Sequence, residues 1–146
     1  MNYLDTSALI KRFVAERGSG LVDALVLDGT PVATAKIAYA EVYSGLARKR
    51  REGHLREAAY LSACRLFEAE WRACIQVELT DEVLRVARDV IRRRALRSFD
   101  AIHVASALEL KKRLNETMTF AAADRPLLRA ARSEGLAPLD VEAEAK

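Results

Sequence analysis

Four acidic residues in this sequence occupy positions at which chemistry is expected. Asp5 ends an apolar stretch at the amino terminus, and Asp124 follows a second β-rich stretch. Glu41 and Asp100 lie among small and apolar residues near the expected starts of two helices. A carboxylate in such surroundings loses hydration, which costs free energy unless a partner compensates it. The four acids are therefore candidates for one shared site.

Grouped carboxylates favour the binding of a cation. Two carboxylates about 4 Å apart repel each other by about 4 kcal/mol at an effective dielectric constant near 20. Three or four of them raise one another's pKa values and take up protons unless a cation lies between them. Mg²⁺ and Mn²⁺ prefer such hard oxygen ligands, and a water activated by the metal can attack phosphorus.

Each acid also has a structural interpretation. Asp5 could cap the helix that follows it, and Asp100 in a first helical turn would be favoured by the helix dipole. His103 lies three residues after Asp100 on the same helix face, where it could bind metal or transfer a proton. We favour the alternative that His103 packs beside the site or hydrogen-bonds a neighbour.

The elements that would position these residues alternate between strands and helices. Strands are expected over residues 2–5, 31–34, 74–79, 117–122 and 137–141. Helices are expected over residues 6–16, 21–27, 36–52, 54–73, from about 80, 99–114 and 125–134, with Ser98 capping the helix that begins at 99. This order predicts an α/β fold with a central, mainly parallel sheet of four to five strands flanked by helices. Ligand sites in such sheets lie at the carboxyl ends of strands, where Asp5 and Asp124 are expected.

Length and composition favour one soluble domain. The 146 residues are 51% hydrophobic and 31% charged, which argues against disorder and predicts a domain over residues 1–141 with a short tail at 142–146. No apolar run exceeds four residues, far short of the roughly 20 that a membrane span needs. The amino terminus lacks the features of a signal peptide, and Cys64 and Cys74 lack metal-binding or disulfide spacing. We therefore expect a cytoplasmic protein.

The charge distribution is more informative than the net charge of +3, which results from 24 cationic and 21 acidic residues. Eleven of the cations lie in three short clusters, at 48–51, 92–97 and 111–113. Such clusters could follow a phosphate backbone. Alternatively, each is the solvated end of a helix, where cations suit the negative end of the dipole.

Four segments, in order along the chain, resemble the PIN-domain ribonucleases, specifically the small VapC-like toxins of toxin–antitoxin pairs. They are Tyr-Leu-Asp-Thr-Ser-Ala-Leu-Ile at 3–10, Ala-Tyr-Ala-Glu-Val at 38–42, Ser-Phe-Asp-Ala-Ile-His-Val-Ala-Ser-Ala-Leu at 98–108, and Phe-Ala-Ala-Ala-Asp at 120–124 followed by Leu-Leu-Arg-Ala-Ala. The resemblance implies a PIN-like fold and a metal-dependent endoribonuclease whose products carry a 5′-phosphate and a 3′-hydroxyl. It also implies a homodimer and a cognate, VapB-like antitoxin.

The resemblance also assigns roles to individual residues. In the family, four acids converge around Mg²⁺ or Mn²⁺, and the match carries these roles to Asp5, Glu41, Asp100 and Asp124. Ser7 matches a small hydroxyl residue after the first Asp, with Thr6 beside it, and would hydrogen-bond a carboxylate or cap a helix. The family often has a hydroxyl residue two positions before the last acid. This sequence has alanine there, at 122, which removes one hydrogen bond to the acid.

Three arginines are candidates for an RNA-binding track. Arg48 lies seven residues after Glu41, two turns along the same helix face. Arg94 and Arg97 approach the start of the Asp100 helix from the other direction. We hypothesise that these three side chains contact RNA phosphates beside the acids.

Other functions stay open at this point. The chain could be a PIN nuclease of ordinary RNA processing without an antitoxin, or a PIN-like RNA-binding module without catalysis. A phosphotransferase or phosphatase of another α/β fold is less compatible, because the segment after Asp5 lacks a second Asp two positions on. The sequence also lacks a glycine-rich phosphate loop with lysine.

Overall fold

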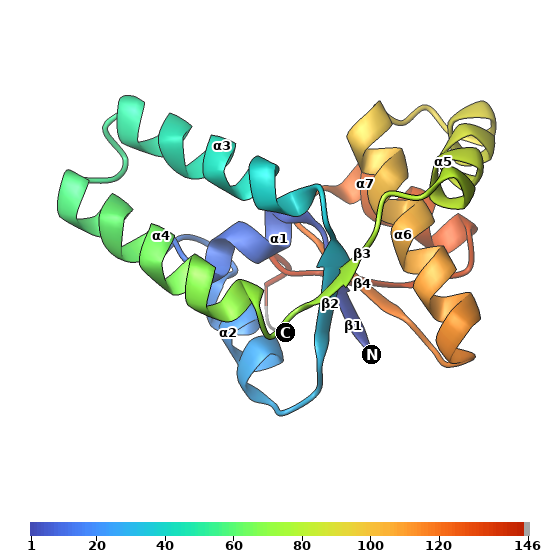
Figure 1. The fold of residues 1–146 in the computed structure, drawn as a ribbon, viewed down its shortest axis with the longest axis horizontal. Coiled ribbons are helices and arrows are strands. Elements are labelled where there is room, and N and C mark those ends of the chain that lie inside the picture. Colours follow the sequence, from blue (N-terminus) through green and yellow to red (C-terminus); the bar gives the residue numbers. More distant parts are fainter. Residues whose placement is uncertain (145–146) are drawn as a thin grey trace.

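A computed structural model of the chain, which describes residues 1–144, is built around a five-stranded sheet (Figure 1). The strands are β1 (Asn2–Leu4), β2 (Val32–Ala35), β3 (Ile75–Val77), β4 (Thr119–Ala122) and β5 (Ala137–Asp140). Their order is β3-β2-β1-β4-β5, and all four neighbouring pairs are parallel. This confirms the predicted α/β fold, with every strand pair parallel.

Helices cover both faces of the sheet. They are α1 (Thr6–Leu9), the 3-10 turn η1 (Ile10–Arg12), α2 (Ser19–Leu27), α3 (Ala38–Arg51), α4 (Glu57–Trp71), α5 (Asp81–Arg93), α6 (Ser98–Leu114) and α7 (Arg125–Ser133). In Figure 1, α3 and α4 extend as a helical pair to one side of the sheet, and α5, α6 and α7 lie on the other. Among the described residues, no helix is long and apolar enough to cross a membrane.

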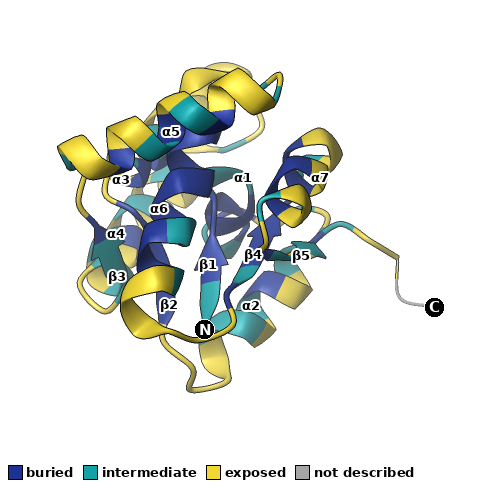
Figure 2. Cartoon of the chain, turned by 90° about the vertical axis from the view of Figure 1, so that its right-hand side faces the viewer, coloured by how far each residue is buried: buried dark blue, intermediate teal, exposed yellow. Residues whose placement is uncertain are grey.

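The two faces of the sheet bury separate apolar cores. Successive strand residues point to opposite faces, so Tyr3 packs with α5, α6 and α7, whereas Leu4 packs with the α1–α4 side. Helix α6 lies so deep that residues 101–107 are all buried, which explains its small, apolar sequence. Figure 2 shows this burial on β1, β4 and α6, with exposed residues on the outer helix faces.

The first helix is shorter than predicted. A helix was expected to reach Glu16, but α1 ends at Leu9 and tightens into η1. In η1, Lys11 pairs with Glu16 and Glu142, whereas Arg12 pairs with acids on α2 and α4. The tight turn sends neighbouring cations into two separate ion-pair networks, contacts that local sequence does not reveal.

The prediction that Ser98 caps α6 is also wrong. Ser98 is the first helical residue, Arg97 occupies the cap position, and no side chain caps this end. The remaining elements begin and end within about three residues of their predicted bounds.

The chain beyond β5 packs against the amino-terminal half. Gly18 has φ +90°, and a Cβ there would lie 2.6 Å from the Val141 carbonyl oxygen. Glu142, in the segment predicted as a tail, pairs with Lys11 at 2.6 Å. Of that predicted tail, residues 145 and 146 lie outside the described part of the chain.

Candidate active site

One cavity of about 790 Å³ opens at the carboxyl ends of the central strands. The four candidate acids all line it, although they come from different elements. Asp5 directly follows β1, Glu41 is in the first turn of α3, Asp100 is in the first turn of α6, and Asp124 precedes α7. The parallel topology thus brings together residues up to 119 positions apart in sequence.

Asp5 is the most deeply placed of the four acids, with 4% of its surface exposed. It caps α1, because its Oδ1 accepts hydrogen bonds from the Ala8 amide at 3.0 Å and the Ser7 hydroxyl at 2.7 Å. The Ser7 hydroxyl in turn accepts from the Ala123 amide at 2.9 Å, which links α1 to the residue before Asp124. Burial raises the pKa of Asp5 to about 6, despite the opposing effects of His103 and these donors.

Glu41 is held by a hydrogen-bonded chain that ends in the core. Its Oε1 accepts from the Thr6 hydroxyl at 2.8 Å and lies 2.8 Å from Nε2 of His103. A carboxylate only accepts, so Nε2 carries the proton in this contact. Nδ1 of the same ring lies 2.7 Å from the hydroxyl of Tyr3, which is fully buried. This confirms the interpretation of His103 as a residue that hydrogen-bonds a neighbour.

The same contacts set the charge of Glu41. Burial alone would raise its pKa, but the hydrogen bonds from His103 and Thr6 and the charge of His103 outweigh burial, so the pKa is lowered. Glu41 is therefore ionised at neutral pH, in a fixed orientation. Sequence reasoning did not identify Thr6 as the donor to Glu41, because the two residues lie 35 positions apart.

Asp100 and Asp124 are the other two acids that line the cavity. Burial raises the pKa of Asp100, and the nearby carboxylates of Asp124 and Glu41 add to this, whereas Arg97 opposes it. The Arg97 Nε atom lies 3.8 Å from Asp100 Oδ2. Asp124 caps α7, where its Oδ1 accepts from the Leu127 amide at 3.1 Å.

Comparison with known proteins identifies the family of this chain. The PIN domain family matches residues 3–133 of the chain. The chain belongs to the PIN-domain family. It is 42% identical over 107 residues to Ribonuclease VapC45 and to Ribonuclease VapC49, from two strains of Mycobacterium tuberculosis, a match that covers 73% of this chain and 74% of each relative. The resemblance stated from the sequence is thereby confirmed.

Two solved structures share this PIN fold. FitAcB from Neisseria gonorrhoeae superposes with a TM-score of 0.65 at 16% identity, covering 97% of this chain and 98% of that one. FitAB bound to an IR36 DNA fragment gives a TM-score of 0.60 at 19% identity, covering 100% and 99%. At these identities the likeness concerns the fold alone.

The donor set of the PIN site fits a hard, hydrated cation. In Asp5, Glu41 and Asp124 one carboxylate oxygen accepts the hydrogen bonds given above, and the second accepts none from the described residues. Within residues 1–144, no three potential ligands are close enough to form a preassembled metal cluster. Mg²⁺ suits such a spread carboxylate set, because it keeps several of its waters.

Cationic side chains also line the cavity. Of the three predicted arginines, Arg48 and Arg97 line it, and Arg94 does not. Arg94 instead lies 3.5 Å from Glu134, on the α7 side of α6. Lys49, next to Arg48, also lines the cavity, although the sequence analysis did not single it out.

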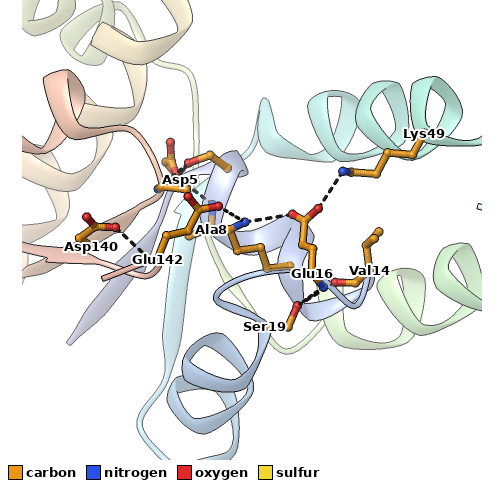
Figure 3. Close-up of polar contacts among 11 residues, drawn as sticks. Asp5, Ala8, Val14, Glu16, Ser19, Lys49, Asp140 and Glu142 are labelled. Carbon is orange, nitrogen blue, oxygen red and sulfur yellow. Dashed lines mark hydrogen bonds and ion pairs between the residues drawn. The ribbon is translucent and has the colours of Figure 1, made fainter. Parts of the chain in front are cut away.

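A partly buried ion network holds Lys49 at the cavity (Figure 3). Lys11 is 4% exposed and lies 3.0 Å from Glu16 and 2.6 Å from Glu142, while Lys49 lies 2.8 Å from the other Glu16 oxygen. Burial alone would lower the pKa of Lys11, but its two carboxylate partners outweigh burial and raise it. The network fixes α3, η1 and the carboxy-terminal segment relative to one another.

Four aromatic side chains gather between the helices of the α3–α4 pair. Tyr39, Tyr43, Phe67 and Trp71 form one cluster between α3 and α4, with ring centroids 5.2–5.7 Å apart. Both tyrosine hydroxyls donate to Glu68. None of these residues lines the cavity that holds the acids, so the cluster packs the helical pair rather than the site.

Proposed function

We propose that this PIN-domain protein is a metal-dependent endoribonuclease that hydrolyses RNA phosphodiester bonds. The observation that carries the proposal is the convergence of Asp5, Glu41, Asp100 and Asp124 on one cavity that cationic side chains also line. Acids alone would repel a phosphodiester, and cations alone would only bind it. The similarity to Ribonuclease VapC45 and VapC49 supports RNA as the substrate class.

The four carboxylates are the proposed ligands of Mg²⁺ or Mn²⁺. When bound, such an ion lowers the pKa of a coordinated water and stabilises negative charge on the phosphate oxygens. The protein's own part is to hold the acids ready. Thr6 and His103 fix the ionised Glu41, and Ser7 fixes Asp5. Burial raises the pKa of Asp5, and a cation beside it would favour the ionised form.

The proposed RNA track begins with Arg48 and Arg97, which line the cavity beside the acids. Arg48 makes no ion pair within residues 1–144, which leaves its guanidinium for a phosphate. Arg97 is 89% exposed and lies at the entrance beside Asp100. Arg94 is engaged with Glu134, so we expect it to contribute less than the other two.

We further propose that the protein is the toxin of a toxin–antitoxin pair, as a homodimer neutralised by a VapB-like antitoxin, and that it acts in the cytoplasm. The names of its ribonuclease relatives support this placement. A PIN nuclease of RNA processing is the alternative. Co-purification of the untagged product of a neighbouring small gene with the tagged protein would support the toxin, and failure to bind that product would favour the alternative.

The nuclease itself is tested with purified, antitoxin-free protein and total cellular RNA. Cleavage is followed with Mg²⁺, with Mn²⁺ and with EDTA, and the new ends are mapped. We expect metal-dependent cleavage that leaves 5′-phosphates and 3′-hydroxyls. RNA that is bound but never cut, with or without metal, would instead identify an RNA-binding module.

A further inference from the structure

One aromatic ring at the cavity has no structural role that the fold explains. Phe99 is 55% exposed, against 38% for Tyr39, the next large aromatic side chain with an exposed surface. Among the described residues it joins neither apolar core and none of the aromatic pairs. Exposing such a ring to water forgoes the free energy that burial would provide.

The position of Phe99 is set by the first turn of α6. It directly precedes Asp100 and lies four residues before His103, so Phe99 and His103 share a helix face. Phe99 is also the one Phe, Tyr or Trp side chain that lines the cavity within residues 1–144. The ring is therefore at the mouth of the acid site.

The surroundings of the ring combine apolar and charged groups. Ile37 and Ala40, at the beginning of α3, line the same cavity, and so does Arg97. A nucleotide has the same two parts, a flat base and a charged phosphate. Of the exposed large apolar side chains within residues 1–144, which include Leu84 and Ile91 on α5, Phe99 alone lines this cavity.

We infer that Phe99 forms a nucleobase subsite. An unpaired RNA base next to the cleaved bond stacks on the Phe99 ring, and Arg97 contacts the phosphate of the same nucleotide. This inference rests on the proposed ribonuclease function and goes beyond it, because it specifies single-stranded RNA at this position. Bases within a duplex are already stacked on their neighbours, whereas bases of loops and single strands are free to stack on aromatic side chains.

The test measures RNA binding without turnover. Phe99→Leu, Phe99→Trp and the control Leu114→Ala are each made in an Asp5→Asn background. Leu114 is exposed at the other end of α6, about 22 Å from Phe99 along the helix. Fluorescence anisotropy then gives the affinity for a labelled 12-nucleotide single strand of mixed sequence, and for the same strand in a duplex, between about 50 and 200 mM salt.

Phe99→Leu is expected to weaken single-strand binding by about 5- to 150-fold, the loss of one stacked base. The slope of log affinity against log salt concentration stays that of the parent, the Asp5→Asn protein, because stacking releases no counterions. Duplex binding is unchanged, Phe99→Trp restores single-strand affinity, and Leu114→Ala has no effect. Circular dichroism and the Tm establish that each variant is folded.

The outcomes distinguish failure of the nucleobase subsite from failure of the proposed nuclease function. If the parent binds RNA and Phe99→Leu binds the single strand equally well, the subsite is refuted and the proposed nuclease stands. An equal loss on single strand and duplex also refutes the subsite, as does a loss limited to binding of a protein partner. If the parent binds no RNA at all, the proposed function fails together with the subsite.

Discussion

The pKa of Asp5 predicts by how much this buried carboxylate destabilises the metal-free protein. Burial raises the pKa of this carboxyl from its ordinary value of 3.8 to about 6 in the folded protein. Because one pKa unit corresponds to about 1.36 kcal/mol, ionised Asp5 costs the metal-free fold about 3 kcal/mol. Because the pKa of Asp5 is higher in the folded protein than in the unfolded chain, deprotonation of Asp5 destabilises the fold. The stability that Asp5 contributes is fully present below about pH 4 and is lost as the pH rises through 6.

Asp5→Asn removes this titration and keeps the cap. The amide oxygen of Asn accepts the same hydrogen bonds from Ser7 and Ala8 that Oδ1 of Asp5 accepts. At pH 8 in EDTA, we expect the variant to unfold with a free energy about 3 kcal/mol higher than the native protein. That difference corresponds to a Tm higher by roughly 6–12 °C. At pH 4 the two proteins should differ by less than about 1 kcal/mol.

Urea denaturation at pH 4, 6 and 8 measures the difference. Asp89→Asn, an exposed carboxylate on α5, is the matched control and should change the free energy of unfolding by less than about 0.5 kcal/mol at every pH. A difference for Asp5→Asn that is absent at pH 8, or equal at pH 4 and pH 8, would refute the argument that desolvation dominates this site.

Three other features of the protein can be tested by substitution or by added metal. His103→Ala leaves Glu41 without its buried partner and should lower the free energy of unfolding by about 2–4 kcal/mol, measured by urea denaturation; a loss below 0.5 kcal/mol contradicts the contact. Gly18→Ala should destabilise the fold by more than Gly29→Ala, because both have φ near +90° but only Gly18 faces the Val141 carbonyl, and equal losses in thermal melts would argue against that packing. Mg²⁺ at about 10 mM should raise the Tm of the native protein at pH 8, and an unchanged Tm would argue against a metal site in the folded state.

The sequence predicted the framework of the site because the relevant signals are local. Turn residues and apolar periodicity located each strand and helix to within about three residues, apart from the first helix. The alternating order then predicted a parallel sheet and the edge at which Asp5 and Asp124 lie. The motifs around Glu41 and Asp100 assigned those two acids to the same edge.

Contacts between distant residues could not be predicted in this way. The chain from Tyr3 through His103 to Glu41 joins residues 62 and 100 positions apart. Similarly, the ion pair of Lys11 with Glu142 spans 131 positions and is tied to the early end of the first helix. A side chain's partner across the fold depends on packing, which local propensity and spacing do not encode.

Ion pairing also separated arginines that looked alike in sequence. Arg94 and Arg97 belong to one basic cluster, yet only Arg97 lines the cavity, since Arg94 turns toward Glu134. On α3, by contrast, Lys49 lines the cavity together with Arg48 and pairs with Glu16. Clustering in sequence thus indicated cationic surfaces without assigning individual side chains to them.

The most direct test of the central claim is RNA cleavage by four single variants of the cavity acids in Mg²⁺. Asp5→Asn, Glu41→Gln, Asp100→Asn and Asp124→Asn are compared with the native protein and with Asp89→Asn. If the four carboxylates form one metal-dependent centre, each variant loses cleavage by at least about 100-fold while remaining folded, and Asp89→Asn cuts at the native rate. Native rates in any two of the four variants would contradict the account.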